Sequence, residues 1–269
     1  MPHTETLAAL ASDSDAELTR LTGEVRRAPG DAKLRTYLFQ LLALRGTWDR
    51  ALSQLQVAAQ LSPLAIPMAQ AYREAIRCEV YRAEVFAGQR QPSLLGTPPA
   101  WAGPLLEALK LFATGRVADA ETLRADALDA APATPGTIDG VAFEWIADMD
   151  SRIGPMCEAF VDGKYVWIPF EHIAALKIDP PADLRDLVWA GAELTFANGG
   201  TTVAMIPSRY PGSHAASDGA LRMARKTAWT ESGEDTFVGQ GQRMWATDAG
   251  EYAMLDVRSI VLTPAPAAA

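Results

Sequence analysis

The chain has 269 residues, of which 49% are hydrophobic and 21% charged. This composition excludes a wholly disordered chain, and domains of about 100–200 residues are common, so the length predicts two domains. No apolar run approaches the ~18 residues of a membrane span, and residues 1–15 lack a basic leader, so we expect a cytoplasmic protein without membrane insertion.

The charge is distributed unevenly along the chain. Up to Gly136 there are 14 Lys and Arg against 15 Asp and Glu, whereas the remainder has 10 against 18. We therefore predict a nearly neutral domain over 1–136 and an acidic domain over 137–269. The overall net charge of −9 argues against nucleic acid as a partner.

The first domain has the periodicity of paired helices. Pro29 and Pro63 lie 34 residues apart, which is the tetratricopeptide period, and Pro132 follows 69 residues later, close to twice that spacing. Gly46 separates two stretches with helical hydrophobic spacing, as a turn between paired helices requires. These patterns predict an all-α domain of tetratricopeptide-like repeats, with a plain helical bundle as the alternative.

Two further helices are predicted in this domain. Residues 13–27 are expected to form the second helix of a degenerate first repeat. The stretch 67–87 predicts a longer helix, because Pro67 suits a first helical turn and Gly88 suits the position after a helix end. A loop is expected to follow over residues 88–100.

The second domain is predicted to be β-rich, because turn residues alternate with short apolar stretches. The turns are expected at Asp162-Gly163, Asn198-Gly199-Gly200 and Asp248-Ala249-Gly250. The flanking strands are expected over 156–161 and 164–168, 193–196 and 202–206, and 243–247 and 251–262. One helix is expected over 217–227. The whole chain therefore predicts an α+β fold, with five to seven short strands and antiparallel hairpins in its second domain.

Motifs of enzymatic chemistry are missing from the sequence. Its three histidines do not form an H-E-x-x-H arrangement, and no phosphate-binding G-x-x-x-x-G-K-[ST] or nucleophilic G-x-S-x-G motif occurs. Cys78 and Cys157 form either one disulfide or, as we expect in the cytoplasm, two reduced thiols, and Cys157 is expected in the core. We therefore predict no enzyme, no catalytic residue and no cofactor.

Three carboxylates lie close together in sequence at Glu144, Asp148 and Asp150. Oxygen ligands of this kind suit hard cations, but the spacing of a calcium loop is absent. Arg152 lies beside Asp150, which favours an ion pair over a metal site.

Arginines and carboxylates of the second domain also allow a substrate pocket. Asp150, Arg152, Arg185 and Arg209 would line such a pocket if they gathered around a ligand. We prefer the alternative in which these residues pair with one another and stabilise the fold; Asp183, Asp186, Tyr210 and Arg243 belong to the same set.

Long segments resemble one known family in a fixed order. The first half contributes RTYLFQLLALRGTWDRALSQLQVAAQLSP and PMAQAYREAIRCEVYRAEVFAGQRQPSLLG. The second half contributes FEWIADMDSRIGP, GKYVWIPF, PADLRDLVW, PSRYPGS, GQGQRMWATDAGEY and LDVRSI. Across residues 20–262 the chain resembles the ImpE/TagJ (SciE-type) family, which comprises accessory components of bacterial type VI secretion.

The resemblance implies a non-enzymatic, cytoplasmic adaptor. Members of the family are similar to adaptors that bind the small subunit of the contractile sheath. They also associate with the hexameric ClpV ATPase, which extracts and recycles contracted sheath. Two alternatives are a small-molecule- or metal-binding module in the second domain and a general repeat scaffold unrelated to secretion.

Stacked helical repeats form concave grooves that suit a partner helix. From the position of Gly46, we expect Lys33, Thr36 and Gln40 to line the inner face of their helix. Arg73 and Arg77 lie four residues apart on one face of the long helix. These five residues, Lys33, Thr36, Gln40, Arg73 and Arg77, are the predicted partner-binding surface, and solvated polar faces are the alternative interpretation.

Overall fold

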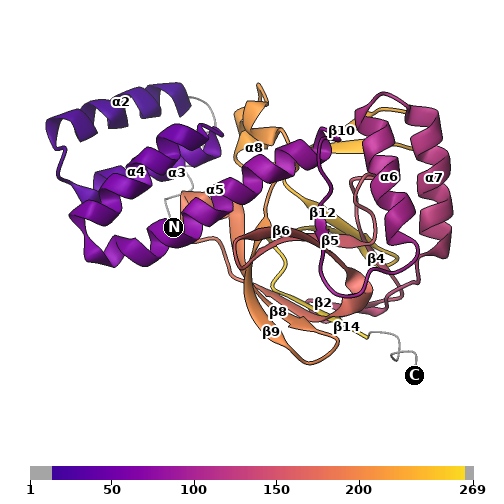
Figure 1. Ribbon diagram of the computed structural model, residues 1–269. Helices are drawn as coiled ribbons and strands as arrows, with labels where there is room; N and C mark the ends of the chain where they lie inside the picture. The colour runs from indigo at the N-terminus through magenta and orange to yellow at the C-terminus, as the bar shows by residue number, and fades with distance from the viewer. Residues whose placement is uncertain (1–13, 264–269) are drawn as a thin grey trace.

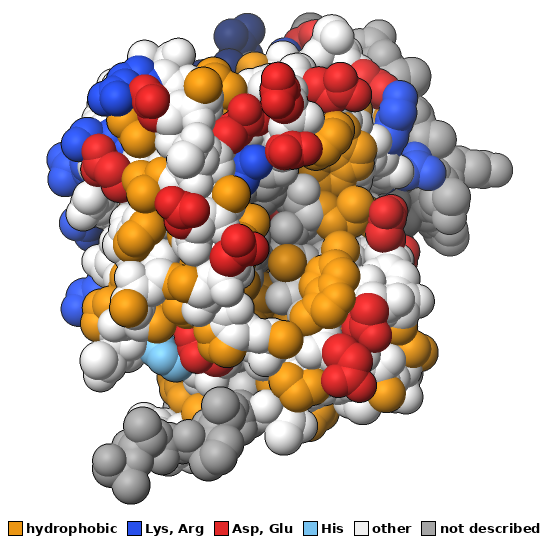
Figure 2. Space-filling model, turned by 90° about the vertical axis from the view of Figure 1, so that its right-hand side faces the viewer, with side chains coloured by type: hydrophobic (Ala, Val, Ile, Leu, Met, Phe, Trp, Pro, Cys, Tyr) orange, Lys and Arg blue, Asp and Glu red, His pale blue; other side chains and the backbone are white. Residues whose placement is uncertain are grey.

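The structure, a computed structural model, describes residues 14–263 (Figure 1). Helices form one end of the molecule, a large sheet forms the other, and two further helices cover the far side of the strands. Seen from that far side, hydrophobic side chains surround a hollow, and many Asp and Glu side chains lie around them (Figure 2). Within the described residues no helix combines the length and the apolar character that a membrane span requires.

The helical elements follow the chain up to residue 130. They are α2 (Ser14–Arg27), α3 (Ala32–Leu44), α4 (Trp48–Leu61), the 3₁₀ turn η1 (Pro63–Ala65), α5 (Ile66–Phe86), α6 (Ala102–Ala113) and α7 (Val117–Ala130). The predicted helices over 13–27 and 67–87 are confirmed as α2 and α5, except that residue 13 lies outside the described residues. The expected loop 88–100 contains one short strand, β1 (Ser93–Leu94).

Two antiparallel helix pairs have the same turn chemistry. Gly46 between α3 and α4 has φ +65°, and Gly115 between α6 and α7 has φ +81°, a backbone conformation that favours glycine. The Asp31 side chain caps α3 by accepting hydrogen bonds from the backbone N–H groups of Lys33 and Leu34. Paired helices of this kind occur in repeats and in plain bundles, so the tetratricopeptide-like interpretation stays a prediction.

The strands of the described chain form three sheets. The largest has the order β1-β6-β5-β9-β8-β7-β14-β2-β3, the second β13-β12-β4 and the third β10-β11. Their strands after β1 are β2 (Gly136–Ile138), β3 (Val141–Phe143), β4 (Ile146–Asp148), β5 (Met156–Val161), β6 (Lys164–Pro169), β7 (Ile173–Ile178), β8 (Trp189–Phe196), β9 (Thr201–Pro207), β10 (Thr227–Glu231), β11 (Phe237–Gly241), β12 (Met244–Thr247), β13 (Gly250–Ala253) and β14 (Ser259–Leu262). The chain is therefore α+β, as predicted.

The hairpins predicted around Asp162-Gly163 and Asn198-Gly199-Gly200 are confirmed as β5–β6 and β8–β9. The third hairpin also forms, but its expected second strand over 251–262 is wrong. The chain leaves β13 after Ala253 and enters another sheet as β14. The predicted five to seven strands are also too few, because several strands are only three or four residues long.

The helix predicted over 217–227 is confirmed only in part. Only α8 (Gly219–Arg222) is helical. Asp218 caps its start, and Ala224 adopts φ +52°, a left-handed conformation that ends the helix. From Thr227 the chain pairs with β11 instead.

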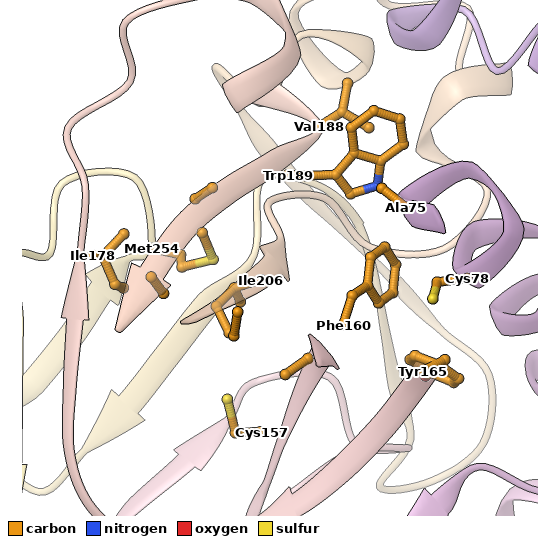
Figure 3. Packing of buried hydrophobic residues seen from close by; sticks show 14 of the residues in the cluster. Ala75, Cys78, Cys157, Phe160, Tyr165, Ile178, Val188, Trp189, Ile206 and Met254 are labelled. Atoms are coloured by element: carbon orange, nitrogen blue, oxygen red, sulfur yellow. The ribbon is translucent and has the colours of Figure 1, made fainter. Parts of the chain in front are cut away.

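One hydrophobic core joins α5 to the large sheet. Trp189 on β8 lies 5.7 Å from Tyr72 of α5 and 5.9 Å from Trp48 of α4, measured between ring centroids. Figure 3 shows Trp189, Phe160 and Tyr165 on the strands beside Ala75 and Cys78 of α5. Neither Cys78 nor Cys157 is in a disulfide, and both are buried, as predicted for Cys157. The division into 1–136 and 137–269 remains our proposal.

Candidate partner-binding groove and buried ion pairs

An open groove lies between α3, the start of α5 and the loop before β8. Three predicted residues line it: Lys33, Thr36 and Gln40. Its cavity volume is about 550 Å³, and its other lining residues are Ala32, Tyr37, Ser62, Leu64, Ala65, Met68, Asp183 and Leu184. The side chains of Lys33, Thr36 and Gln40 share one face because they are spaced by three and four residues. We call this hollow the α3 groove.

The side chains of the α3 groove differ in how exposed they are and therefore in how accessible they are to a partner protein. Leu64 in η1 is 92% exposed, which is the largest exposure among the large hydrophobic side chains of the described residues. Gln40 is only 7% exposed, and its Oε1 accepts a hydrogen bond from the Leu184 backbone N–H. Thr36 donates its hydroxyl to the Ala32 carbonyl. Leu64 and Lys33 are therefore available for contact, whereas Gln40 connects α3 to the 3₁₀ turn η3 (Leu184–Leu187).

Arg73 and Arg77 lie outside the α3 groove. Arg73 lines a hollow between α4 and α5, where Leu52, Leu55 and several glutamines are its neighbours. Arg77 lines a third hollow together with Tyr81 and Lys164, and it forms an exposed ion pair with Glu74 at 3.0 Å. The structure therefore distributes the five predicted residues over three separate hollows.

A group of buried charges lies between α5 and the strands. Arg82 of α5 donates from Nε and Nη2 to both carboxylate oxygens of Glu158 on β5, at 2.8 and 2.9 Å. Arg243, just before β12, pairs with Glu158 and with Asp148 on β4. The hydroxyls of Tyr165 and Tyr210 donate to Glu158 and Asp148. We call these residues the α5–sheet charge network: Arg82, Asp148, Glu158, Tyr165, Tyr210 and Arg243.

The charges of this network shift the pKa values of its carboxyl groups. Burial alone would raise the pKa of Glu158, but Arg82 and Arg243 outweigh that effect and hold the pKa at about 2. Asp148 faces one arginine only, and burial raises its pKa to about 7. Burial also raises the pKa of the Cys157 thiol to about 12, so this thiol is not a reactive thiolate at neutral pH.

The arginines of the suspected substrate pocket are engaged in the fold. Arg152 binds both carboxylate oxygens of Asp150, and Arg185 pairs with Asp183 at 2.6 Å. Arg209 is buried and donates to backbone carbonyls, including that of Leu44 at 2.8 Å. These contacts are the ones expected of structural ion pairs and hydrogen bonds. Within residues 14–263, no group of three or more His, Cys, Asp or Glu side chains is arranged to hold a metal ion.

Sequence reasoning missed Arg82 and Glu158, which form the centre of the network. One signal was present: Glu158 is the one charged residue in the apolar stretch Met156–Val161, every residue of which is buried. A carboxylate there needs a buried partner. No sequence pattern identifies the partner, because Arg82 lies 76 residues earlier.

The fold and the sequence each match known proteins. The crystal structure of protein VPA1032 from Vibrio parahaemolyticus has a TM-score of 0.85 and 21% identity, covers 97% of this chain and 99% of its own, and shows the fold alone. The ImpE protein family model matches residues 140–261. The type VI secretion system accessory component TagJ of Pseudomonas aeruginosa is 49% identical over 94% of this chain and 89% of its own length. The chain therefore belongs to the ImpE family of type VI secretion accessory proteins.

Proposed function

We propose that the protein is a non-enzymatic adaptor of a bacterial type VI secretion system in the cytoplasm. It binds the small subunit of the contractile sheath and associates with the ClpV ATPase during sheath disassembly and recycling. The identity to an accessory component of this system supports the proposal. Arg152, Arg185 and Arg209 already form ion pairs or hydrogen bonds within the protein. This also supports a protein-binding function over a small-molecule-binding one.

The α3 groove is the observation that carries the adaptor proposal. Its walls are mostly apolar, with Lys33 at the rim and the exposed Leu64 beside it. An amphipathic helix buries its apolar face in a groove of this kind and can place an acidic side chain against Lys33. We therefore place a helix of the sheath subunit in the α3 groove, with Arg73 and Arg77 as a second contact along α5.

Calorimetric titration of the intact protein with the cognate sheath small subunit tests this proposal. Leu64→Glu should weaken binding by roughly tenfold or more, because it places a charge where an apolar contact is expected. Val203→Glu is the matched control, since Val203 is also an exposed aliphatic side chain, at 78%, but lies on β9. Equal affinities for the wild type and both variants would remove the α3 groove from the proposal.

The second contact requires its own variant. Arg73→Glu combined with Arg77→Glu should weaken binding while the helical circular dichroism stays unchanged, because both side chains lie in open hollows on α5. Unchanged affinity in this double variant would confine the contact to the α3 groove. Absence of binding by the wild-type protein would contradict the adaptor function itself.

A further inference from the structure

The sheet β13-β12-β4 has one outward face that is apolar. On β4, Ile146 and Asp148 are buried, whereas Ala147 between them is partly exposed. Ala147 pairs with Ala246, and Met244 pairs with Ala253 on the next strand. The Met149 backbone N–H continues this ladder by donating to the Met244 carbonyl at 3.1 Å. Small and flexible apolar side chains therefore form the floor of this face.

Aromatic side chains lie at both ends of that floor. Trp145 precedes β4 and is 41% exposed. At the other end, the Ser151 backbone N–H donates to the carbonyl of Phe237, which is also exposed. Large exposed aromatic side chains next to an apolar floor are typical of binding surfaces in soluble proteins.

Carboxylates form the rim of the same face. Glu251 pairs in register with Ala246, and Asp248 accepts a hydrogen bond from the backbone N–H of Glu144, so these acidic residues lie beside the floor. Within the part of the chain that the structure describes, the side chains of Glu144 and Glu251 form no ion pair. We call the floor and rim together the acidic-rimmed face: Glu144, Trp145, Ala147, Met149, Met244, Ala246, Asp248, Glu251 and Ala253.

The chain segments that form this face contain no basic residue. The stretches 141–151, 227–241 and 244–257 contain no Lys or Arg, although they contain Glu231, Glu234, Asp235 and Asp256 in addition to the rim. Arg124 of α7 reaches the neighbouring segment, but it is buried and donates hydrogen bonds to the Thr236 hydroxyl and the Asp235 carbonyl. Arg243 lies beneath the sheet, but it is buried and paired with Asp148 and Glu158. Figure 2 views the side of the molecule that holds α7 and β4, and it shows carboxylates around the hydrophobic hollow with Lys and Arg mainly at the margins.

We propose that the acidic-rimmed face binds a basic segment of a protein partner, in which Lys or Arg side chains flank apolar ones. The apolar side chains would cover Ala147, Ala246 and Met244, and the cationic groups would reach Glu144 and Glu251. Unpaired carboxylates around an apolar floor select such a segment over an acidic one, because charge complementarity both steers association and rejects like charge. This site shares no residue with the α3 groove, so it does not rest on the adaptor proposal.

Fluorescence anisotropy with the full chain tests the proposal. The probe is a labelled twelve-residue peptide in which lysine alternates with valine, and the matched peptide has glutamate in place of each lysine. The lysine peptide should bind and the glutamate peptide should not. Glu144→Lys combined with Glu251→Lys should weaken binding of the lysine peptide by roughly tenfold or more, because two attractions become repulsions. Trp145→Ala should weaken it by roughly fivefold through lost apolar contact.

A second double variant separates local recognition from overall charge. Asp49→Lys combined with Glu193→Lys changes the net charge by the same amount on exposed residues of α4 and β8. It should leave the affinity within about twofold of the wild type, since neither residue belongs to the acidic-rimmed face and salt screens interactions between distant surface charges. Equal weakening by both double variants would overturn the proposal, as would absence of binding by the lysine peptide. Analytical ultracentrifugation tests whether a second copy of the chain occupies this face instead. A dimer that Trp145→Ala abolishes would also overturn the proposal.

Discussion

Two arginines on the same helix show how strongly position determines what a charge contributes. Near the middle of α5, Arg77 pairs with Glu74 in the open, where 71% and 38% of the two side chains are exposed. Little more than one turn later, Arg82 pairs with Glu158, where 3% and 0% of the two side chains are exposed. Water screens the first pair, which is free to exchange Glu74 for a partner's carboxylate. The second pair is buried between helix and sheet, where Arg243 and Tyr165 also bind Glu158, so its further partners belong to the same buried network.

The same difference extends to the two ends of the molecule. At the helical end the predicted contact residues border open hollows and make few bonds. Where α5 meets the strands, Arg82, Asp148, Glu158 and Arg243 satisfy one another within a buried network. Charge at the helical end is therefore suited to recognition, and buried charge between α5 and the strands is suited to holding elements in position.

Removal of the buried carboxylate should give the largest effect. Glu158→Gln leaves Arg82 and Arg243 without their shared anion, and we expect a loss of about 3–5 kcal/mol in the free energy of unfolding. Urea unfolding followed by circular dichroism measures it. The matched variant on α5, Glu74→Gln, should change stability by less than about 1 kcal/mol because its pair is exposed. Similar losses in both variants would contradict the comparison.

Lowering the pH should destabilise the folded protein through the same carboxyl group, that of Glu158. The pKa of Glu158 is lowered from 4.5 to about 2 in the folded protein, so the unfolded chain binds this proton more readily. The stability contributed by Glu158 is therefore complete above about pH 4.5 and is lost as the pH falls toward 2, by about 3.5 kcal/mol at 1.4 kcal/mol per pKa unit. Titration of the ¹³C-labelled Glu158 carboxyl by NMR measures the pKa, and a value at or above 4 would contradict the prediction.

The turn at Gly46 should give a smaller effect. A Cβ at this position would lie 2.4 Å from Cδ2 of His214, and the backbone has φ +65°. Gly46→Leu should therefore lower the free energy of unfolding by about 1–3 kcal/mol through overpacking and strain. Gly103→Leu is the control, because nothing lies within 4 Å of a Cβ there and its φ is not positive. An unaltered melting curve for Gly46→Leu would contradict a close approach at this turn.

Local patterns allowed much of the secondary structure to be predicted. Asp162-Gly163 and Asn198-Gly199-Gly200 determine their hairpins within a few residues, because left-handed turn conformations favour these residue types. The helix predicted over 217–227 is shorter than expected because Thr227 pairs with Gly241 in a strand. The residues of the predicted helix alone do not indicate this pairing.

How well each candidate site could be predicted depended on how far apart its residues lie in the sequence. Helical spacing placed Lys33 and Thr36 on one face, and both border the α3 groove. That groove also needs Leu184, which comes from a distant segment, so its shape could not be derived from α3 alone. The pairing of Arg82 with Glu158 joins residues 76 positions apart, and only the folded chain shows it.

The short strand β1 has a consequence for how the protein can be divided. Ser93 and Leu94 pair in parallel with Val166 and Trp167, so a segment from before Gly136 forms one edge of the nine-stranded sheet. A chain cut at residue 136 would separate that edge strand from β6 and Arg82 from Glu158 in one step. We therefore expect the two fragments to fold only together. Residues 137–269 alone lack the edge strand β1, and residues 1–136 alone leave α5 without the sheet that covers it.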